Sequence, residues 1–384
     1  MTVTLEQLTK FYLFKQFLSP AAREKDVVTV AGALCGLHAQ AALTPCLSLF
    51  NRIKNFEPAM LEDALYREKS LVKTWCVRGT LHIIPSGDFS IYHNALERMW
   101  FEHHGRYMRP PEWPSKEERR EFLYPMITEA LAEKPLRRKE INSKVLSLFK
   151  NPPNSYKRLF SAWGGILKDT SYLGLAVHAE PIGNETCFAR LDQWLPNIDL
   201  HEVDEDQARA RLLLKYLQGY GPASAQDFIC WSGLLTDEAK KAAGDIQSEL
   251  AQVHVQPFEK NLWILKTDLK KLERIDAEEK TPPYLLPRFD PLLLGHKNRL
   301  RTIEPAFQKQ VYRKAGDVAA SVLINGRVAG TWNYKKTKRK ITIFMNPFER
   351  IDKESLIDLK RLANDIGAFM KAEQVELFLD QVSM

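Results

Sequence analysis

The sequence predicts an α+β protein in which three winged helix-turn-helix domains precede a C-terminal β-rich region. Helical patterns followed by two strand patterns occur three times before residue 280, and strand patterns dominate after it. Helices followed by a two-stranded ribbon are the element order of a winged helix. A chain of 384 residues, 45% hydrophobic and 27% charged, has room for several such domains. The expected domains are residues 1–108, 109–200, 201–279 and 280–384.

The first expected domain shows apolar residues at helical spacing and then two alternating segments. Its expected helices are Leu5–Leu18, Val27–Leu37, Thr44–Ile53 and Pro58–Tyr66, and its expected strands are Leu71–Val77 and Thr80–Ile84. Thr44 is a suitable N-cap for the third helix, with Pro45 at the first helical position. A tight turn at Arg78 and Gly79 joins the two strands.

The same order returns twice, without sequence identity between the copies. A connector rich in proline and charge covers Arg109–Lys116. The second domain is expected to have helices over Glu118–Ala132, Glu140–Phe149 and Ser155–Lys168 and strands over Tyr172–Val177 and Cys187–Arg190. The third is expected to have helices over Gln207–Leu217, Ala223–Trp231 and Thr236–Leu250 and strands over Val253–Val255 and Leu262–Leu265.

The C-terminal region has the pattern of a sheet with one long helix. Asn325-Gly326 between two apolar runs is a strong signal for a β-hairpin. The expected strands are Ala319–Ile324, Arg327–Tyr334, Ile341–Met345 and Val375–Leu379, and the expected helix is Glu354–Ala372.

Two polar residues, His38 and Gln40, lie where the second and third expected helices meet. Residues two apart on a regular helix point about 200° apart, so only a bend or a helix end brings both side chains to one target. We therefore expect them at a helix end, both open to one hollow. The alternative is that they only cap the corner between the helices.

Five motifs, taken in order, extend over most of the chain. They are Gly36–Gln40, Lys73–His82, Gly221–Phe228 with Trp231–Leu234, Leu286–Pro291 with Leu294–His296 and Arg299, and Asn325–Trp332. Together they resemble the AlkZ- and YcaQ-type DNA glycosylases, a family built from tandem winged helices. The resemblance implies a C-shaped concave clamp with a basic DNA-binding surface.

The resemblance also implies where the chemistry occurs. In that family a Gln-Φ-Gln or Gln-Φ-Asp triplet, with Φ apolar, carries the reaction. Ala39 and Gln40 match the last two positions, whereas His38 stands where the family has Gln. The implied activity is monofunctional removal of N-alkylated purines such as N7-alkylguanine and N3-alkyladenine, including unhooking of interstrand crosslinks, without metal or cofactor. The expected catalytic residues are His38 and Gln40.

The chemistry of these side chains suits such a substrate. An N7- or N3-alkylated purine already carries positive charge, so its departure needs no strong general acid, unlike sugar hydrolysis by paired carboxylates. A Gln amide can face the sugar or a water with its carbonyl oxygen. A neutral imidazole can accept the proton of that water. Asp88 and Asp290 are alternatives, although Asp in such turns is more often a turn or cap residue.

Basic and aromatic side chains mark the expected DNA surface. The densest basic cluster follows the Asn325-Gly326 hairpin, at the tip of the next one. The residues expected to contact DNA are Arg52, Trp75, Arg78, His82, Arg299, Lys335, Lys336, Lys338 and Arg339. The rival interpretation is a non-catalytic winged-helix regulator or damage sensor, which would normally bind half-sites as a dimer.

Composition and charge indicate the kind of partner and the cellular compartment to expect. The net charge is +7, which favours an anionic partner such as double-stranded DNA carrying alkylated purines. The five cysteines form no Cys-x-x-Cys pair, and His103-His104 lacks a third ligand, so we expect no metal site and a reducing cytoplasm. No apolar run reaches 18 residues, so we expect no membrane association, and three domains in one chain favour a monomer.

Overall fold

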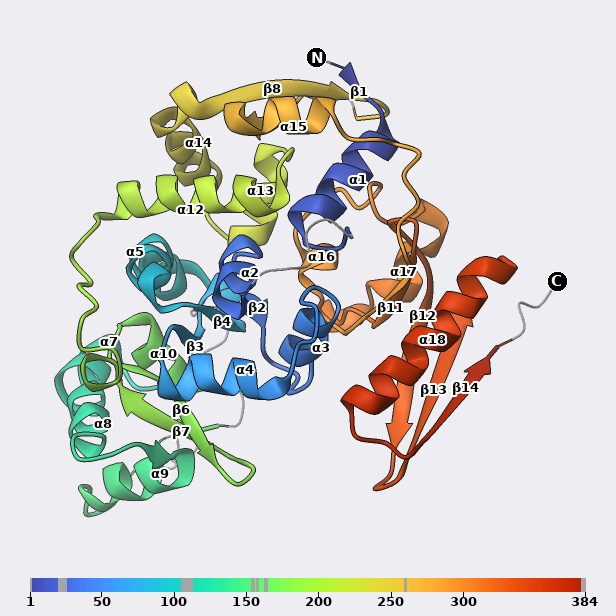
Figure 1. Ribbon diagram of the computed structural model, residues 1–384. Helices are drawn as coiled ribbons and strands as arrows, with labels where there is room; N and C mark the ends of the chain where they lie inside the picture. The colour runs from blue at the N-terminus through green and yellow to red at the C-terminus, as the bar shows by residue number, and fades with distance from the viewer. Residues whose placement is uncertain are drawn as a thin grey trace. The chain divides into compact units, whose positions relative to one another are not determined.

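The computed structural model describes residues 2–19, 26–104, 113–152, 156, 159–161, 165–258 and 261–380. The chain forms two compact units, each assembled from segments far apart in the sequence (Figure 1). Unit 1 comprises Met1–Met60, Leu213–Trp231 and Ala243–Met384, and unit 2 comprises Leu61–Leu212 and Ser232–Ala242. The expected connector Arg109–Lys116 and the expected helix Ser155–Lys168 lie partly outside the described residues.

Helices form in the N-terminal part of unit 1 where the sequence predicts them, but the second is shorter than expected, because it ends at Ala33 and Leu37 lies in a strand. The elements are β1 (Thr2–Val3), α1 (Leu5–Lys15), α2 (Val27–Ala33), β2 (Leu37–His38) and α3 (Thr44–Phe50). Thr4 caps α1 in a capping box with Gln7, and Asp26 caps α2. The predicted cap of α3 is wrong by one residue, because Leu43 occupies the cap position without a side-chain bond. The Thr44 hydroxyl instead donates to the Arg288 carbonyl.

A three-stranded sheet packs against α1 within unit 1. Its order is β1-β8-β9, with β8 (Leu250–Val255) antiparallel to β9 (Leu262–Leu265) and parallel to β1. The β8–β9 pair confirms the two strands predicted over Val253–Val255 and Leu262–Leu265. Its apolar face packs with Leu8 and Phe11 of α1 and with Leu272 of α15 (Leu269–Glu273).

The C-terminal part of unit 1 is a five-stranded sheet with one helix along it (Figure 1). The strand order is β10 (Tyr284–Leu286), β11 (Ser321–Ile324), β12 (Arg327–Lys336), β13 (Lys340–Pro347) and β14 (Gln374–Leu379). Alternate residues of β13, namely Ile341, Ile343 and Met345, are buried against α18 (Lys353–Phe369). The hairpin at Asn325-Gly326 is confirmed, and both turn residues have positive φ.

Unit 2 joins the first two predicted wings into one sheet. β3 (Leu71–Trp75) pairs antiparallel with β4 (Leu81–Pro85), and β6 (Ala176–Ile182) pairs antiparallel with β7 (Glu185–Arg190). Lys73 of β3 is opposite His178 of β6, which connects the two pairs, and β5 (Leu136–Arg137) extends the sheet beyond β7. The strands predicted over Leu71–Val77, Thr80–Ile84 and Cys187–Arg190 are present. The strand predicted over Tyr172–Val177 is mostly wrong, because Tyr172 ends a helix and β6 begins only at Ala176. The sequence also does not reveal that the two pairs share a sheet.

The strands of this sheet alternate in the chain with short helices. They include α5 (Phe89–Met99), α8 (Tyr124–Ala130), α9 (Arg138–Ser147), α10 (Ile166–Tyr172) and α11 (Leu191–Trp194). Further helices lie where the sequence predicts them, as α12 (Glu205–Tyr220), α13 (Ala225–Ser232) and α14 (Thr236–Asp245). The last of these was expected to reach Leu250, which instead begins β8. Across the residues described, no helix is both long and apolar enough to cross a membrane.

Candidate active site

The segment that carries His38 leaves α2 through a sharp left-handed turn. Cys35 and Gly36 have φ values of 51° and 97°, and the Gly36 amide donates to the Ala31 carbonyl at 2.8 Å. Glycine at Gly36 avoids the steric cost that a side chain has at such a φ. The turn ends α2 and directs Leu37–His38 into the short strand β2.

His38 and Gln40 lie between two helices, as the sequence predicts, but their surroundings differ. Gln40 is exposed, whereas His38 is 4% exposed and its ring lies 4.6 Å from the Phe289 ring at 23°. The prediction that both side chains open into one hollow is therefore wrong, because His38 is buried, although Gln40 is exposed as expected. The two residues are neither on one helix nor both in the core: the Gln40 side chain is accessible, whereas the His38 imidazole is buried.

One face of α3 and of the turn that follows it anchors the segment around Phe289, whose ring stacks on His38. Thr44, Ser48 and Arg52 follow at intervals of four, so their side chains lie on one face. All three bind the segment that contains Arg288 and Asp290. The Thr44 hydroxyl donates to the Arg288 carbonyl at 2.9 Å, and the Ser48 hydroxyl donates to the Asp290 carboxylate at 3.0 Å.

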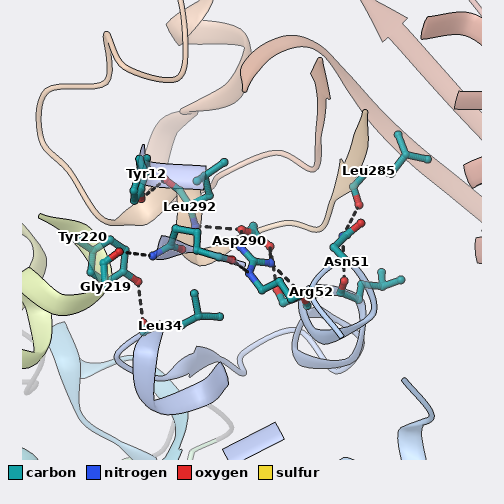
Figure 2. Close-up of polar contacts among 12 residues, drawn as sticks. Tyr12, Leu34, Asn51, Arg52, Gly219, Tyr220, Leu285, Asp290 and Leu292 are labelled. Atoms are coloured by element: carbon teal, nitrogen blue, oxygen red, sulfur yellow. Dashed lines mark hydrogen bonds and ion pairs between the residues drawn. The ribbon is translucent and has the colours of Figure 1, made fainter. Parts of the chain in front are cut away.

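Arg52 completes this face with a bidentate ion pair to Asp290 (Figure 2). The two N–H···O distances are 2.7 and 2.9 Å, and both side chains are fully buried. The remaining guanidinium contacts go to the carbonyls of Gln16 and Ser48. The prediction that Arg52 contacts DNA is therefore wrong. Its charge is neutralised in the core, where such pairing is required.

Asp290 also has the cap role that its sequence context favours. Its carboxylate accepts the Leu292 amide at 3.0 Å and so begins α16 (Pro291–Leu294). Two tyrosines anchor neighbouring backbone, as Figure 2 shows: Tyr12 donates to the Leu292 carbonyl at 2.8 Å, and Tyr220 donates to the Leu34 carbonyl at 2.7 Å. Leu34 directly follows α2, so the Tyr220 bond anchors the chain before His38, while the α3 face anchors the chain after it.

An open cavity of about 600 Å³ in unit 1 begins directly after Gln40. Ala41, Ala42 and Leu43 line one part of it, and Arg288 and Tyr334 line another. Arg313, Asp317, Asn333 and Asn346 also border the cavity, and sequence reasoning did not select them. All four lie far from the His38 segment in the chain: Asn333 and Asn346 belong to β12 and β13, and Arg313 and Asp317 precede β11.

Unit 2 holds three of the residues expected to contact DNA. Trp75 is 8% exposed and stacks with Phe188 at 5.9 Å, and His82 is 5% exposed, with Nδ1 3.1 Å from the Thr80 carbonyl. Both side chains are interior groups of β3 and β4, so their predicted DNA contact is wrong. Arg78 is partly exposed at a φ of 53°, and its DNA contact stays a prediction.

The basic cluster at the tip of the β12–β13 hairpin is exposed, as the sequence predicts. Lys335 and Lys336 end β12, and Lys338 and Arg339 form the turn to β13. Arg339 lies 3.7 Å from the Glu373 carboxylate, whereas among the described residues no carboxylate lies within 4.0 Å of Lys336 or Lys338. Within the part of the chain that the structure describes, these two lysines at the hairpin tip therefore have no carboxylate partner.

The last residue expected to contact DNA is Arg299. Its guanidinium lies only 3.4 Å from the centre of the Tyr312 ring, and its side chain is partly exposed. The aromatic ring holds the planar cation in one orientation, and DNA contact by Arg299 stays a prediction.

Titratable groups elsewhere in the described residues do not gather into a metal-binding set of three or more His, Cys, Asp or Glu side chains. Near the site, burial and then the nearby Arg301 guanidinium lower the pKa of His296 to about 3. The Nε2 atom of His296 is 2.8 Å from the Tyr220 carbonyl. This histidine is therefore a neutral core group, distinct from the candidate His38.

Comparison with known proteins agrees with the resemblance in the sequence. The family model of AlkZ-like DNA glycosylases matches residues 31–371. An interstrand DNA cross-link repair glycosylase of Streptomyces sahachiroi is 26% identical over 375 residues, which cover 92% of this chain and 95% of that protein. The solved structure of the Streptomyces sahachiroi DNA glycosylase AlkZ is 23% identical, with a TM-score of 0.84 over 99% of this chain and 100% of that one. The chain therefore belongs to the AlkZ-like family and is a DNA glycosylase.

Proposed function

We propose that this glycosylase hydrolyses the N-glycosidic bond of N-alkylated purines in double-stranded DNA and leaves an abasic site. The observation that carries the proposal is the placement of Gln40, exposed and directly followed by residues that line an open cavity. An open site accommodates a large adduct more readily than a deep pocket for a flipped base. The similar Streptomyces protein is a crosslink repair glycosylase, which supports interstrand crosslinks as a further substrate.

Gln40 and His38 have complementary roles in this proposal. The alkylated base leaves with its positive charge neutralised, so the enzyme must stabilise an oxocarbenium-like sugar and supply a water. The Gln40 carbonyl oxygen faces the sugar or the water, because the amide offers an acceptor without a full charge. His38, as a neutral imidazole, accepts the proton of that water, a contribution of about 10²–10⁴ in rate. His38 at the first position of the triplet would make the reaction depend on pH.

The DNA surface in this proposal includes the tip of the β12–β13 hairpin. Lys335, Lys336, Lys338 and Arg339 present positive charge without any geometry that reads base edges. Such residues bind phosphates and fix the register of the duplex rather than its sequence. We propose Arg78 and Arg299 as further phosphate contacts, and a monomer bound across the lesion.

The experiment that tests the function uses a duplex with a single N7-methylguanine, incubated with the protein in EDTA. We expect strands to break only after alkali, because a monofunctional glycosylase leaves the abasic site intact. The same assay on a duplex with a crosslink between N7 atoms of guanines on opposite strands tests unhooking. Absence of alkali-labile sites in both substrates would contradict the proposal and favour the non-catalytic regulator or sensor.

A pH series tests the role of His38 as a base. Single-turnover excision is expected to rise with pH and then level off, since only the neutral imidazole accepts a proton. His38→Gln should keep activity and lose this rise. If both proteins show the same flat profile, His38 only positions other groups.

A further inference from the structure

Phe289 occupies a backbone conformation that is unusual for a bulky residue. Its φ is 59°, in the left-handed region where a side chain carries a steric cost and where Gly or Asn is far more common. Such conformations persist only when the surrounding structure determines them, and they are concentrated at functional sites. The φ of Phe289 therefore indicates that neighbouring residues hold its backbone and that the residue has a function.

Both neighbours of Phe289 are fixed by side chains of unit 1. The Arg288 carbonyl accepts from Thr44, and the Arg288 guanidinium pairs with Asp317. On the other side, Asp290 is held by Ser48 and by the bidentate pair with Arg52. Because the residues before and after it are both fixed, Phe289 keeps its strained φ.

The ring of Phe289 touches His38. The two ring centroids are 4.6 Å apart with an interplanar angle of 23°, which is a stacked arrangement. The Arg288 guanidinium lies 5.2 Å from the centre of the same Phe289 ring. The imidazole of His38 thus lies against a ring that is itself restrained, and rotation about its last side-chain bond would lose this contact.

We propose that Phe289 is a positioning residue: held by the face formed by Thr44, Ser48 and Arg52, it fixes the plane of the His38 imidazole for base excision. This inference rests on the proposed role of His38. It gives the buried Arg52–Asp290 pair a task in function, since the pair holds the strained segment from which Phe289 reaches His38. A catalytic group that is misplaced by about 1 Å can lose a factor of 10² in rate.

The test compares Phe289→Leu with Phe289→Tyr in the full-length protein. Leu keeps an apolar side chain but removes the ring, whereas Tyr keeps the ring. The matched control is Phe307→Leu, because Phe307 is also partly exposed, lies in unit 1 and stacks on Phe348 at 4.7 Å and 20°. The readouts are single-turnover excision of N7-methylguanine at saturating protein, the half-saturating concentration, and the NMR signals of ¹³C-labelled histidine rings, with the His38 signals assigned by their loss in His38→Gln.

We expect Phe289→Leu to slow excision at least tenfold at an unchanged half-saturating concentration, and Phe289→Tyr to stay within about twofold of the wild type. The His38 ring signals should move in Phe289→Leu and remain in place in Phe289→Tyr and Phe307→Leu. Equal rates in Phe289→Leu and Phe307→Leu, or a slow Phe289→Leu with unmoved His38 signals, would overturn the proposal.

Two further outcomes separate this inference from the proposed function. If the wild type excises no N7-methylguanine, the proposed function fails, whatever the spectra show. If Phe289→Leu does not fold, the wild-type spectrum decides: stacking requires cross-relaxation between the ring protons of His38 and Phe289, and its absence would overturn the inference.

Discussion

Arg52 and the pair Lys336 and Lys338 are cations for which the sequence predicts the same role in DNA binding, yet the structure treats them in opposite ways. Arg52 is fully buried, and its guanidinium is bound to Asp290 and to two carbonyls. Lys336 and Lys338 are exposed at the tip of a hairpin. A charge that the core neutralises stabilises the fold, whereas a charge left in solvent is available to a phosphate.

The comparison shows that a basic residue near a catalytic motif is not thereby a ligand contact. Arg52 is close to Gln40 in the chain, but the helical interval that begins at Thr44 turns it toward Asp290. The lysines are far from the motif in sequence, and their exposure leaves them free to bind. Environment rather than proximity in sequence distinguishes the two roles.

The largest expected effect follows from breaking the buried pair. Arg52→Met leaves the Asp290 carboxylate buried and unpaired, which costs about 3–5 kcal/mol in the free energy of unfolding. Arg339→Met, the same change at an exposed arginine, is expected to stay within about 0.5 kcal/mol. Urea unfolding of the two variants measures the contrast, and equal stabilities would show that the Arg52 pair is not a structural element.

A second contrast between a buried and an exposed group concerns how histidines affect stability at acid pH. His296 has a pKa of about 3 in the folded protein, because burial and then Arg301 disfavour its charged form. Its unfolded value is about 6.5, so the unfolded chain takes up a proton first and stability falls as the pH drops from about 6.5 toward 3. His296→Gln should therefore reduce this acid dependence by about 1.4 kcal/mol per pH unit.

The matched control for His296 is His201→Gln, since His201 is exposed in unit 2. Urea unfolding at pH 4.5, 5.5 and 6.5 gives the slope for each variant. His296→Gln can be less stable at every pH, so the slope and not the absolute stability is the readout. A slope equal to that of the wild type would contradict the assignment of His296 as a neutral core group.

The smallest expected effect comes from the exposed lysines. If Lys336 and Lys338 contact phosphates, log affinity falls with log salt by about 0.9 for each contact. Replacing both with Gln should therefore flatten the salt slope by about one to two units. The control is the double change Lys353→Gln and Lys360→Gln, which removes the same charge from exposed positions of α18. Equal slopes in both double variants would mean that the hairpin lysines are only solvated.

Much of the local structure could be predicted from the sequence. Alternation and the turn at Asn325-Gly326 located β11 and β12, and apolar spacing located α1, α12 and α18. These signals depend on neighbours within a few residues. The pairing of β3 with β6 and the addition of β1 to β8 could not be predicted, because no local pattern specifies a partner strand so distant in the chain.

The candidate site was predictable only where it depends on residues close together in the chain. The motif around His38 and Gln40 is contiguous, so the sequence identifies it together with its position between two helices. The stack of His38 on Phe289, the pairing of Arg52 with Asp290 and the cavity lining from β12 and β13 all join distant segments. Arg52 illustrates this limit, because its interval from Ser48 is visible in the sequence whereas their shared partner, Asp290, is not.

The central claim is that Gln40 acts in base release while Arg52 and its partners only hold the site. The most direct test is single-turnover excision of N7-methylguanine by Gln40→Ala, beside Gln310→Ala at another exposed glutamine of unit 1. We predict that Gln40→Ala slows excision about 10²-fold, within the range for such groups, with stability and DNA affinity close to wild type. Gln310→Ala should match the wild type in every respect. Excision by Gln40→Ala at the wild-type rate would contradict the account and place the chemistry elsewhere.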